Sequence, residues 1–425
     1  MTGLLVIAGF IALLLWGMPV AFALLIPSAI YILLSGMPTM MVAHIPTFAL
    51  DSFPLLAVPL FILVGNLMNG AGITTRIFGF ANDLVSHWRG GLAQVNILAS
   101  LIFSGSSGAA LADIGGIGAM EVKAMREAGY PPRFAAALTV ASATVGPIFP
   151  PSIPLIIYGA VAEVSAVRLL LSGILPALLT VGFLMVFTYA LSVRRNYPRG
   201  ERRTPTKEIV RSFWSAFPAL LTPVIMIGGM LLGVFTATEA AAITVAYILL
   251  ITVFIYRSFN IRHILTATID TVKTTSVVIV MVAAAAVFAR ILALEQVPQN
   301  TARLMLSLTD DPLVLLLLVN LLVLAAGLFL ETISAILLLV PLIVPPLLLV
   351  GVDPVHLGVV IVFNLMLGLL TPPMGMSLFL ISDVAKVPVQ HVLREVLPYY
   401  VPLFGVLLLI TFVPALSLWI PSLVR

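Results

Sequence analysis

The sequence lacks cysteine altogether and carries little charge. Of its 425 residues, 9% are charged and 61% are hydrophobic. Without cysteine, disulfide bonds, Cys-ligated zinc and thiol catalysis are excluded. Soluble domains contain about 25% charged residues, so this composition excludes a soluble enzyme and a disordered scaffold. The basic residues are bunched at the edges of apolar runs, where they set membrane topology, so we expect no nucleic-acid partner.

The apolar runs are long and unbroken, which excludes an outer-membrane barrel and predicts an all-α polytopic membrane protein in a lipid bilayer. No Lys or Arg occurs before Arg76. A secretory signal peptide needs a basic start, so the first run is expected to remain as a span. The predicted spans are 3–18, 20–35, 53–72, 134–158, 169–193, 213–233, 237–256, 274–294, 355–381 and 398–420.

Two further apolar segments, 90–127 and 312–350, are interrupted in the middle by small or polar residues. The loop 194–211 holds seven Lys and Arg residues, so the positive-inside rule places it in the cytoplasm. Counting spans outward from this loop puts both ends of 90–127 inside and both ends of 312–350 outside. Each segment is therefore predicted to be a re-entrant helical hairpin, one entering from each side.

The second half of the chain repeats the first at an offset of 222 residues. The matching pairs are Gly129/Gly351, Pro132/Pro354, Gly146/Gly368, Pro150/Pro372, Pro151/Pro373, Leu175/Leu397 and Pro176/Pro398. Because the hairpins before these motifs enter from opposite sides, the repeat is predicted to be inverted. Inverted repeats in secondary transporters place the substrate site near the bilayer midplane, at broken helices.

The expected breaks lie at 103–108 and 145–152 in the first half and at 329–334 and 368–374 in the second. Two adjacent prolines beside a glycine predict an unwound stretch, since proline inside a helix costs about 3 kcal/mol. The freed carbonyl groups suit a small hard cation, and the helix N-termini that follow suit an anion. These features predict a cation-coupled anion site with approximate two-fold symmetry.

Several segments resemble the large membrane subunit of tripartite ATP-independent periplasmic (TRAP) transporters. They are SGSSGAALAD (104–113), GPIFPPSIPLIIYG (146–159), GVFTATEAAA (233–242), FLETISA (329–335) and GLLTPPMGMSLF (368–379). The resemblance covers nearly the whole chain, and it implies sodium-driven import of an organic acid by an elevator mechanism in a bacterial inner membrane. It also implies a periplasmic substrate-binding protein and a small four-helix membrane subunit, which we expect to be a separate chain. The substrate stays open among C4-dicarboxylates, sialic acid and similar acids, and no cofactor is expected beyond Na⁺ as the coupling ion.

The resemblance also implies roles for particular residues. One sodium site would use Ser104 and Ser107 with the carbonyl groups of Gly146 and Phe149. The other would use Thr332, Gly368, Thr371 and Met374. The substrate carboxylate would meet Ser106, Ser107 and Ser152, and Glu331 at the opposite hairpin tip would bind hydroxyl or amide groups of the substrate.

The expected organisation alternates scaffold and transport parts. Residues 1–52 form scaffold helices, and 53–193 form the first repeat, with the hairpin 90–127, an arm and a scaffold helix. The cytoplasmic loop 194–211 leads to scaffold helices over 212–273. The second repeat, 274–396, contains the hairpin 312–350 and an arm, and 397–425 form a C-terminal scaffold helix.

Other interpretations compete with these assignments. The serine cluster Ser104, Ser106 and Ser107 also suits close helix packing, and Glu239 fits a capping box with Thr236. No capping signal explains Glu331, which therefore remains a site candidate. A stand-alone dicarboxylate/sodium symporter would need no binding protein. An intramembrane serine protease would fit Gly105-Ser106-Ser107-Gly108 but needs a histidine base, and all five histidines are expected near span ends.

Overall fold

The computed structural model describes residues 2–70, 72–199, 204–258, 260–309 and 311–423. Within these ranges the regular secondary structure is helical, apart from one isolated bridge between Arg89 and Arg199. The predicted all-α class is confirmed. The first half contains α1 (Thr2–Leu15), α2 (Val20–Leu34), α3 (Met41–Leu50), η1 (Phe53–Leu56), α4 (Ala57–Gly70), α5 (Ile73–Val85), α6 (Gly91–Ser107), α7 (Ala110–Gly115), α8 (Ile117–Glu127), α9 (Pro132–Ser142), η2 (Ala143–Val145), α10 (Ile153–Ala162), α11 (Ala166–Ser172) and α12 (Ile174–Arg194).

The second half follows the basic loop. It contains α13 (Thr206–Leu231), α14 (Ala237–Leu250), the π-helical turn η3 (Ile251–Ile255), α15 (Ile261–Leu294), α16 (Val297–Leu308), α17 (Pro312–Gly327), α18 (Thr332–Leu349), α19 (Pro354–Leu369), α20 (Met376–Ala385), α21 (Val389–Val396), η4 (Leu397–Tyr399), α22 (Tyr400–Phe412), α23 (Ala415–Leu418) and η5 (Pro421–Leu423).

Six helices are long and apolar enough to cross a membrane, and the helix pair Met41–Leu50 and Phe53–Asn69, bent by 68°, adds a seventh if it counts as one span. Several other apolar helices, including α10, α17, α19 and α20, are only 10–17 residues long. A spanning helix needs about 20 residues. The short helices therefore fit interrupted spans and hairpin arms, whose exposed backbone must be covered by protein.

The repeat seen in the sequence is present in the helices. Helix α9 starts at Pro132 and α19 at Pro354, a difference of 222 (354 − 132), and each start uses the fixed φ of proline. Both helices stop before their Pro-Pro pair, and both pairs contain a cis peptide bond. The predicted breaks at the two Pro-Pro pairs are confirmed, as are the interruptions inside 90–127 and 312–350.

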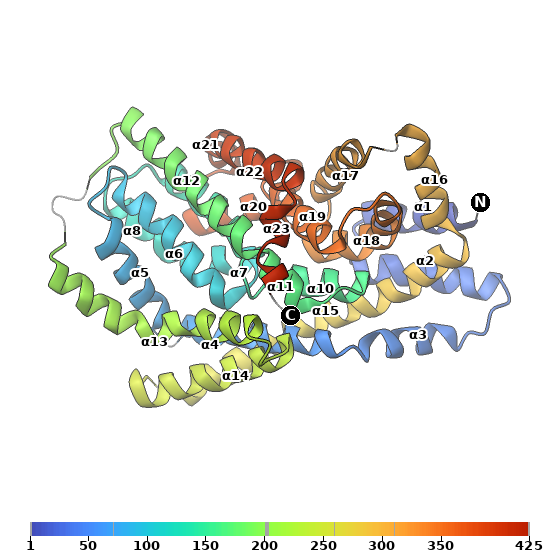
Figure 1. Cartoon of the computed structure of the whole chain (residues 1–425), viewed down its shortest axis with the longest axis horizontal. Helices are drawn as coiled ribbons and strands as arrows, with labels where there is room; N and C mark the ends of the chain where they lie inside the picture. Colours follow the sequence, from blue (N-terminus) through green and yellow to red (C-terminus); the bar gives the residue numbers. More distant parts are fainter. Residues whose placement is uncertain (1, 71, 200–203, 259, 310, 424–425) are drawn as a thin grey trace.

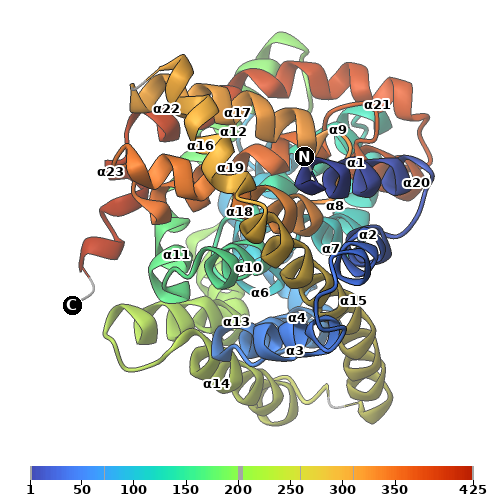
Figure 2. The same ribbon diagram turned by 90° about the vertical axis from the view of Figure 1, so that its right-hand side faces the viewer.

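The helices form an outer frame around a centre made by both repeats. Helices α3 and α14 run along one side of the molecule, and α12, α21 and α22 lie on the opposite side (Figures 1 and 2). Helix α15 packs against α2, α3 and α4, and α13 packs against α5 and α14. The hairpins and the broken helices lie between these sides.

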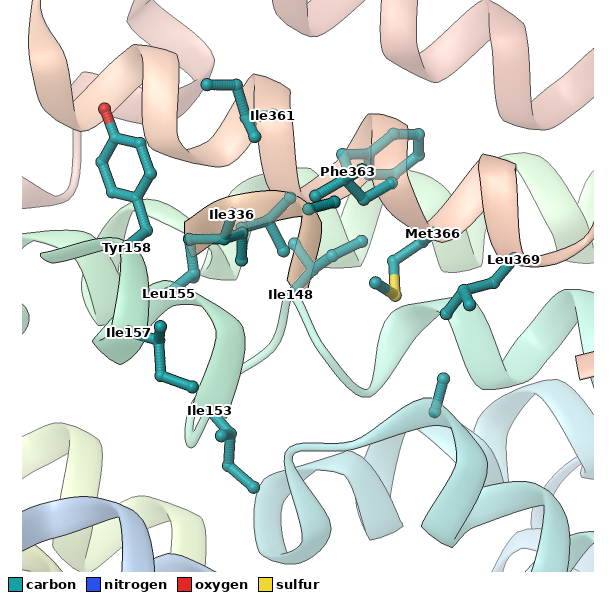
Figure 3. Packing of buried hydrophobic residues seen from close by; sticks show 14 of the residues in the cluster. Ile148, Ile153, Leu155, Ile157, Tyr158, Ile336, Ile361, Phe363, Met366 and Leu369 are labelled. Carbon is teal, nitrogen blue, oxygen red and sulfur yellow. The ribbon is translucent and has the colours of Figure 1, made fainter. Parts of the chain in front are cut away.

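Helix α10 of the first repeat packs against α18 and α19 of the second, which joins the repeats at the centre. Leu155 and Ile336 are fully buried between these elements, and Phe363 extends the same apolar layer (Figure 3). The Tyr158 hydroxyl donates to the Pro354 carbonyl oxygen over 2.8 Å. Its ring lies against Gly358, where a Cβ atom would come within 2.6 Å of the ring. This apolar layer joins the broken helix of the first repeat to the hairpin and the broken helix of the second.

Candidate functional site

A cavity of ≈420 Å³ lies where the two hairpin tips meet. Ala109–Ala112 line it from the first tip, and Glu331–Ile333 line it from the second. Pro147 of the first break and Met366 of α19 complete its inner wall. The remaining lining residues are Ile62, Ile153, Pro154, Thr274, Val278 and Leu369. The cavity thus occupies the junction of the two repeats that the sequence predicts as the substrate site.

Each hairpin tip is joined to the break of its own repeat by one backbone hydrogen bond. In the first repeat the Ile153 N–H donates to the Gly108 carbonyl oxygen over 3.4 Å. In the second the Met374 N–H donates to the Leu328 carbonyl oxygen over 3.2 Å. Both donors follow directly on the stretch containing the Pro-Pro pair. The same connection therefore positions both tips beside unwound backbone.

The predicted first sodium site is assembled only in part. The Ser104 hydroxyl donates to the Ser100 carbonyl oxygen over 2.6 Å, and the Ser107 hydroxyl donates to Asp113. The carbonyl oxygens of Gly146 and Phe149 accept no hydrogen bond from any described residue. These two carbonyl groups are therefore free to bind a cation.

The predicted second site lies where α17 meets the break after α19. A Cβ atom on Gly368 would come within 2.7 Å of Gly327, so these two helices touch through glycine backbone. The Thr371 hydroxyl donates to the Leu367 carbonyl oxygen over 2.7 Å. Thr332 is buried and its hydroxyl has no hydrogen-bond partner in the described part of the chain. Met374 is 53% exposed, and its carbonyl oxygen accepts no hydrogen bond from the described residues.

Of the predicted substrate residues whose side chains are described, Glu331 lies in the cavity wall and Ser107 and Ser152 do not. Ser152 is fully buried and acts as the N-cap of α10, because its hydroxyl oxygen accepts from the Leu155 N–H over 3.2 Å and also bonds to the Pro147 carbonyl oxygen. Ser107 is turned toward Asp113. The side chain of Ser106 lies outside the described part of the chain.

Glu239 and Glu331 both take part in helix caps. Glu239 forms the predicted capping box with Thr236, whose N–H donates to the carboxylate over 2.9 Å. The expectation that no cap explains Glu331 is wrong. Its carboxylate accepts the N–H groups of Ile333 and Ser334 over 3.0 and 3.3 Å and begins α18. Glu331 therefore has a structural role in addition to its place in the cavity wall.

Sequence reasoning missed two buried carboxylates in the first hairpin. Asp113 on α7 is 1% exposed and Glu121 on α8 is fully buried. An ionisable residue in an apolar hairpin is a functional candidate by default, and that signal was present in the sequence at both positions. The contacts of these carboxylates with Ser107 and Ser100 are set by the tertiary structure and could not be read from the sequence.

The arrangement contains no serine-protease geometry in the described residues. Ser107 pairs with a carboxylate instead of a histidine. His356 is buried in the first turn of α19, where its backbone N–H donates to Asp353, the N-cap of that helix. The hydroxyl groups of Ser104 and Ser107 bond to Ser100 and Asp113 and not to a histidine.

The family model of the DctM component of tripartite ATP-independent periplasmic transporters matches residues 7–416 of this chain. The sialic acid TRAP transporter large permease protein SiaM of Vibrio cholerae is 47% identical over 421 residues, which cover 98% of both chains. The C4-dicarboxylate TRAP transporter large permease protein DctM of Pseudomonas aeruginosa is 36% identical, over 88% of this chain and 87% of that one.

Longer relatives also match. The sialic acid TRAP transporter permease protein SiaT of Haemophilus influenzae is 40% identical over 97% of this chain, and the match covers 68% of SiaT. Among solved structures, the Alcanivorax borkumensis YdaH transporter superposes with a TM-score of 0.67 over 88% of this chain and 87% of that one. At 16% identity, this likeness shows a common fold and nothing finer.

Proposed function

This chain belongs to the DctM component family of the tripartite ATP-independent periplasmic transporters, and from that premise we propose that it imports a small organic acid with Na⁺ as the coupling ion. As a large permease of this family it is a transport protein and not an enzyme. Sialic acid and C4-dicarboxylates, which appear in the names of relatives, are the first substrates to test.

The observation that carries the proposal is the cavity between the two hairpin tips. It is bordered by unwound backbone at Pro147 and by the N-terminus of α18 at Glu331–Ile333. At the start of α18 the N–H groups of Ile333 and Ser334 are occupied by Glu331. The N–H groups left for a substrate carboxylate are those of Ala110–Ala112 at the start of α7, which have no partner among the described residues. Free carbonyl groups such as those of Gly146 and Phe149 favour a hard cation. The junction therefore offers both kinds of ligand close to one space.

Energetics favours cation coupling. Moving one charge through 100 mV is worth about 2.3 kcal/mol, so a dianion entering against that potential costs about 4.6 kcal/mol. Two sodium ions would balance this cost. The paired breaks at Gly146–Ser152 and Gly368–Met374 supply two related candidate sites.

An exit path from the cavity is supported by a second, polar cavity of ≈540 Å³, which shares Ala112 with the first. Asn66, Asn69, Thr74 and Thr75 contribute its polar lining. This second cavity lies beside the end of α4. There α4 contacts the start of α15, because the Leu67 carbonyl oxygen is 3.2 Å from His263 Nε2. Because α15 starts on the side of the basic loop, this cavity leads toward the cytoplasm.

We infer an elevator mechanism in a bacterial inner membrane, in which the hairpins carry the cavity past a fixed frame. In support, α12, α13, α14 and α22 contribute none of the described lining residues, whereas α4 and α15 contribute Ile62, Thr274 and Val278. A periplasmic binding protein would deliver the acid, and a small four-helix membrane subunit would complete the permease. A stand-alone symporter that needs no binding protein is the alternative.

Reconstituted uptake tests these assignments. Proteoliposomes containing the chain with its small subunit are given radiolabelled sialic acid or succinate, with or without a Na⁺ gradient and with or without periplasmic extract. We expect uptake that requires both Na⁺ and extract. Uptake without extract would favour the stand-alone symporter, and uptake indifferent to Na⁺ would overturn sodium coupling.

Substitutions test the cation sites in the same assay. Ser104→Leu and Thr371→Leu place bulky apolar side chains in the first and second sites, so each is expected to abolish Na⁺-dependent uptake. Ser276→Leu is the matched control, because Ser276 is exposed on α15 and its hydroxyl bonds within that helix, to the Val272 carbonyl oxygen. Unchanged sodium dependence in the two site variants would refute the site assignment.

A further inference from the structure

The cavity between the two hairpin tips has one ionisable side chain among its described lining residues, that of Glu331. No Lys, Arg or His belongs to this part of the wall. The other polar side chains of the wall are those of Thr274 and Thr332. A second carboxylate on a bound acid would therefore find no cationic side chain to pair with, and a buried charge without a partner is costly.

Glu331 has a carboxylate oxygen that its own helix does not use. The N–H groups of Ile333 and Ser334 both donate to Oε2, over 3.0 and 3.3 Å. The ion pairs of the described residues do not involve Glu331. Because Glu331 lines the cavity, its second oxygen, Oε1, is the acceptor that this wall offers to a bound molecule.

Helix α18 stabilises the charged form of Glu331. The two N–H groups on Oε2 and the positive end of the helix dipole both favour a carboxylate, whereas burial opposes its charge. A charged Glu331 repels a second carboxylate on the substrate. It accepts hydrogen bonds from a hydroxyl, amide or ammonium group at the same place.

We propose that this cavity selects organic acids with a single carboxylate, and that Glu331 determines this selectivity. The inference rests on the proposed import of an organic acid through this cavity, and it narrows the class of substrate. The carboxylate of such an acid would face the first hairpin tip, as in the proposed function. A neutral or cationic donor group of the same molecule would bind Glu331.

The size of the cavity and the lining of its neighbour agree with this class. Cavities of about 300–1,000 Å³ hold drug-sized ligands, so a four-carbon dicarboxylate would leave much of the ≈420 Å³ unfilled. The adjoining cavity, which shares Ala112, is lined by Asn66, Asn69, Thr74 and Thr75 and by no charged residue that the structure describes. These amide and hydroxyl groups suit an acid with neutral polar groups and offer no cationic partner for a second carboxylate.

The test is ligand-induced thermal stabilisation of the full-length permease in detergent, at saturating Na⁺ and at pH 8, where a buried carboxyl is more fully ionised. The compounds are sialic acid, which has one carboxylate, and two matched pairs, succinate with succinamate and glutarate with glutaramate. In each pair an amide replaces one carboxylate at almost the same size. For the unmodified protein we expect the amide acid to reach half-maximal stabilisation at a concentration at least about tenfold lower, because like charges brought together are costly.

Variants test whether Glu331 is the cause. Glu331→Gln should bring the two concentrations of each pair to within about threefold. It should also raise the concentration needed for sialic acid about tenfold, because a charged acceptor binds donors more strongly than a neutral one. Glu239→Gln is the matched control and should change neither value, since Glu239 also takes part in a helix cap but is not among the described lining residues of either cavity.

A second variant adds the positive charge that the wall lacks. Thr274→Lys places an ammonium group in the cavity wall from α15, so it should also remove the preference within each pair. It replaces Glu331→Gln if that variant does not fold. The unfolding temperature without any acid shows whether each variant is folded.

The outcomes separate this inference from the proposed function. If no compound stabilises the unmodified protein in Na⁺, the proposed import of an organic acid fails. If a dicarboxylate stabilises it at the same concentration as its amide acid or lower, import stands and the selectivity is wrong. A preference unchanged in both Glu331→Gln and Thr274→Lys would overturn the proposal, and so would an equal loss in Glu239→Gln. If sialic acid alone binds, an unchanged concentration in Glu331→Gln contradicts the role of Glu331.

Discussion

Single glycines determine how closely each hairpin tip approaches the unwound backbone of its own repeat. Gly108 has φ +64°, a left-handed conformation that other residues adopt at a cost of about 1–2 kcal/mol. A Cβ atom there would also overlap the Pro151 carbonyl oxygen. In the second repeat, Gly327 and Gly368 make the equivalent close contact between α17 and α19. Each hairpin tip can therefore approach the unwound backbone of its repeat only because glycine has no side chain.

Gly108→Ala should destabilise the protein by at least about 2 kcal/mol, because strain in the backbone adds to the overlap with Pro151. The measurement is the thermal unfolding of the purified protein. Gly115→Ala in the same hairpin is the control, since a Cβ atom there meets nothing within 4 Å, and its effect should stay within about 0.5 kcal/mol. Equal unfolding temperatures for the two variants would contradict the packing argument.

At the scale of helices, one carboxylate joins three elements at the edge of the molecule. Glu395 on α21 lies 3.1 Å from Arg133 at the start of α9 and also bonds to Arg195 at the end of α12. Its side chain is 11% exposed, whereas the two arginines are 60% and 33% exposed. A carboxylate this buried, with two partners, contributes more than an ordinary surface pair. Glu395 thus fixes the arm helix α21 against the first broken helix.

Glu395→Gln is expected to lower the free energy of unfolding by about 1–3 kcal/mol, because it leaves two arginines facing a neutral amide. Asp383→Asn provides the comparison. Asp383 pairs with Lys386 in the same repeat, but both side chains are at least 75% exposed, so the change should be below about 0.5 kcal/mol. Chemical denaturation of both variants in detergent checks the difference, and similar losses would show that Glu395 is only a surface charge.

The interruptions of the helices were predictable from the sequence because they are local. The proline pairs at 150–151 and 372–373 lack backbone N–H donors whatever the tertiary structure around them. Helices α9 and α19 both end before these pairs. The buried polar cluster of the first hairpin was not predictable, because it joins Ser100 to Ser142 across 42 residues. The cap made by Glu331 was missed for another reason: glutamate is not among the residues that favour the N-cap position.

For the molecule as a whole, the opposite orientation of the two repeats determines which side each hairpin faces. Helix α8 ends at Glu127 and α18 at Leu349, which are equivalent positions at the offset of 222 (349 − 127). The positive-inside rule predicts that they lie on opposite sides of the membrane, because Lys123 and Arg126 accompany the first position and no basic residue accompanies the second. A parallel repeat would put both positions on the same side.

The absence of cysteine allows a direct test of this inversion. Glu127→Cys and Leu349→Cys each introduce the only thiol of the chain, at side chains that are 68% and 72% exposed. A membrane-impermeant maleimide should label Leu349→Cys in right-side-out spheroplasts and Glu127→Cys in inside-out vesicles, because each hairpin returns to the side from which it enters. The unmodified protein controls for background, and labelling after denaturation confirms that each thiol is reactive. Labelling of both variants from one side would rule out the inverted repeat and, with it, a shared site formed by hairpins that enter from opposite faces.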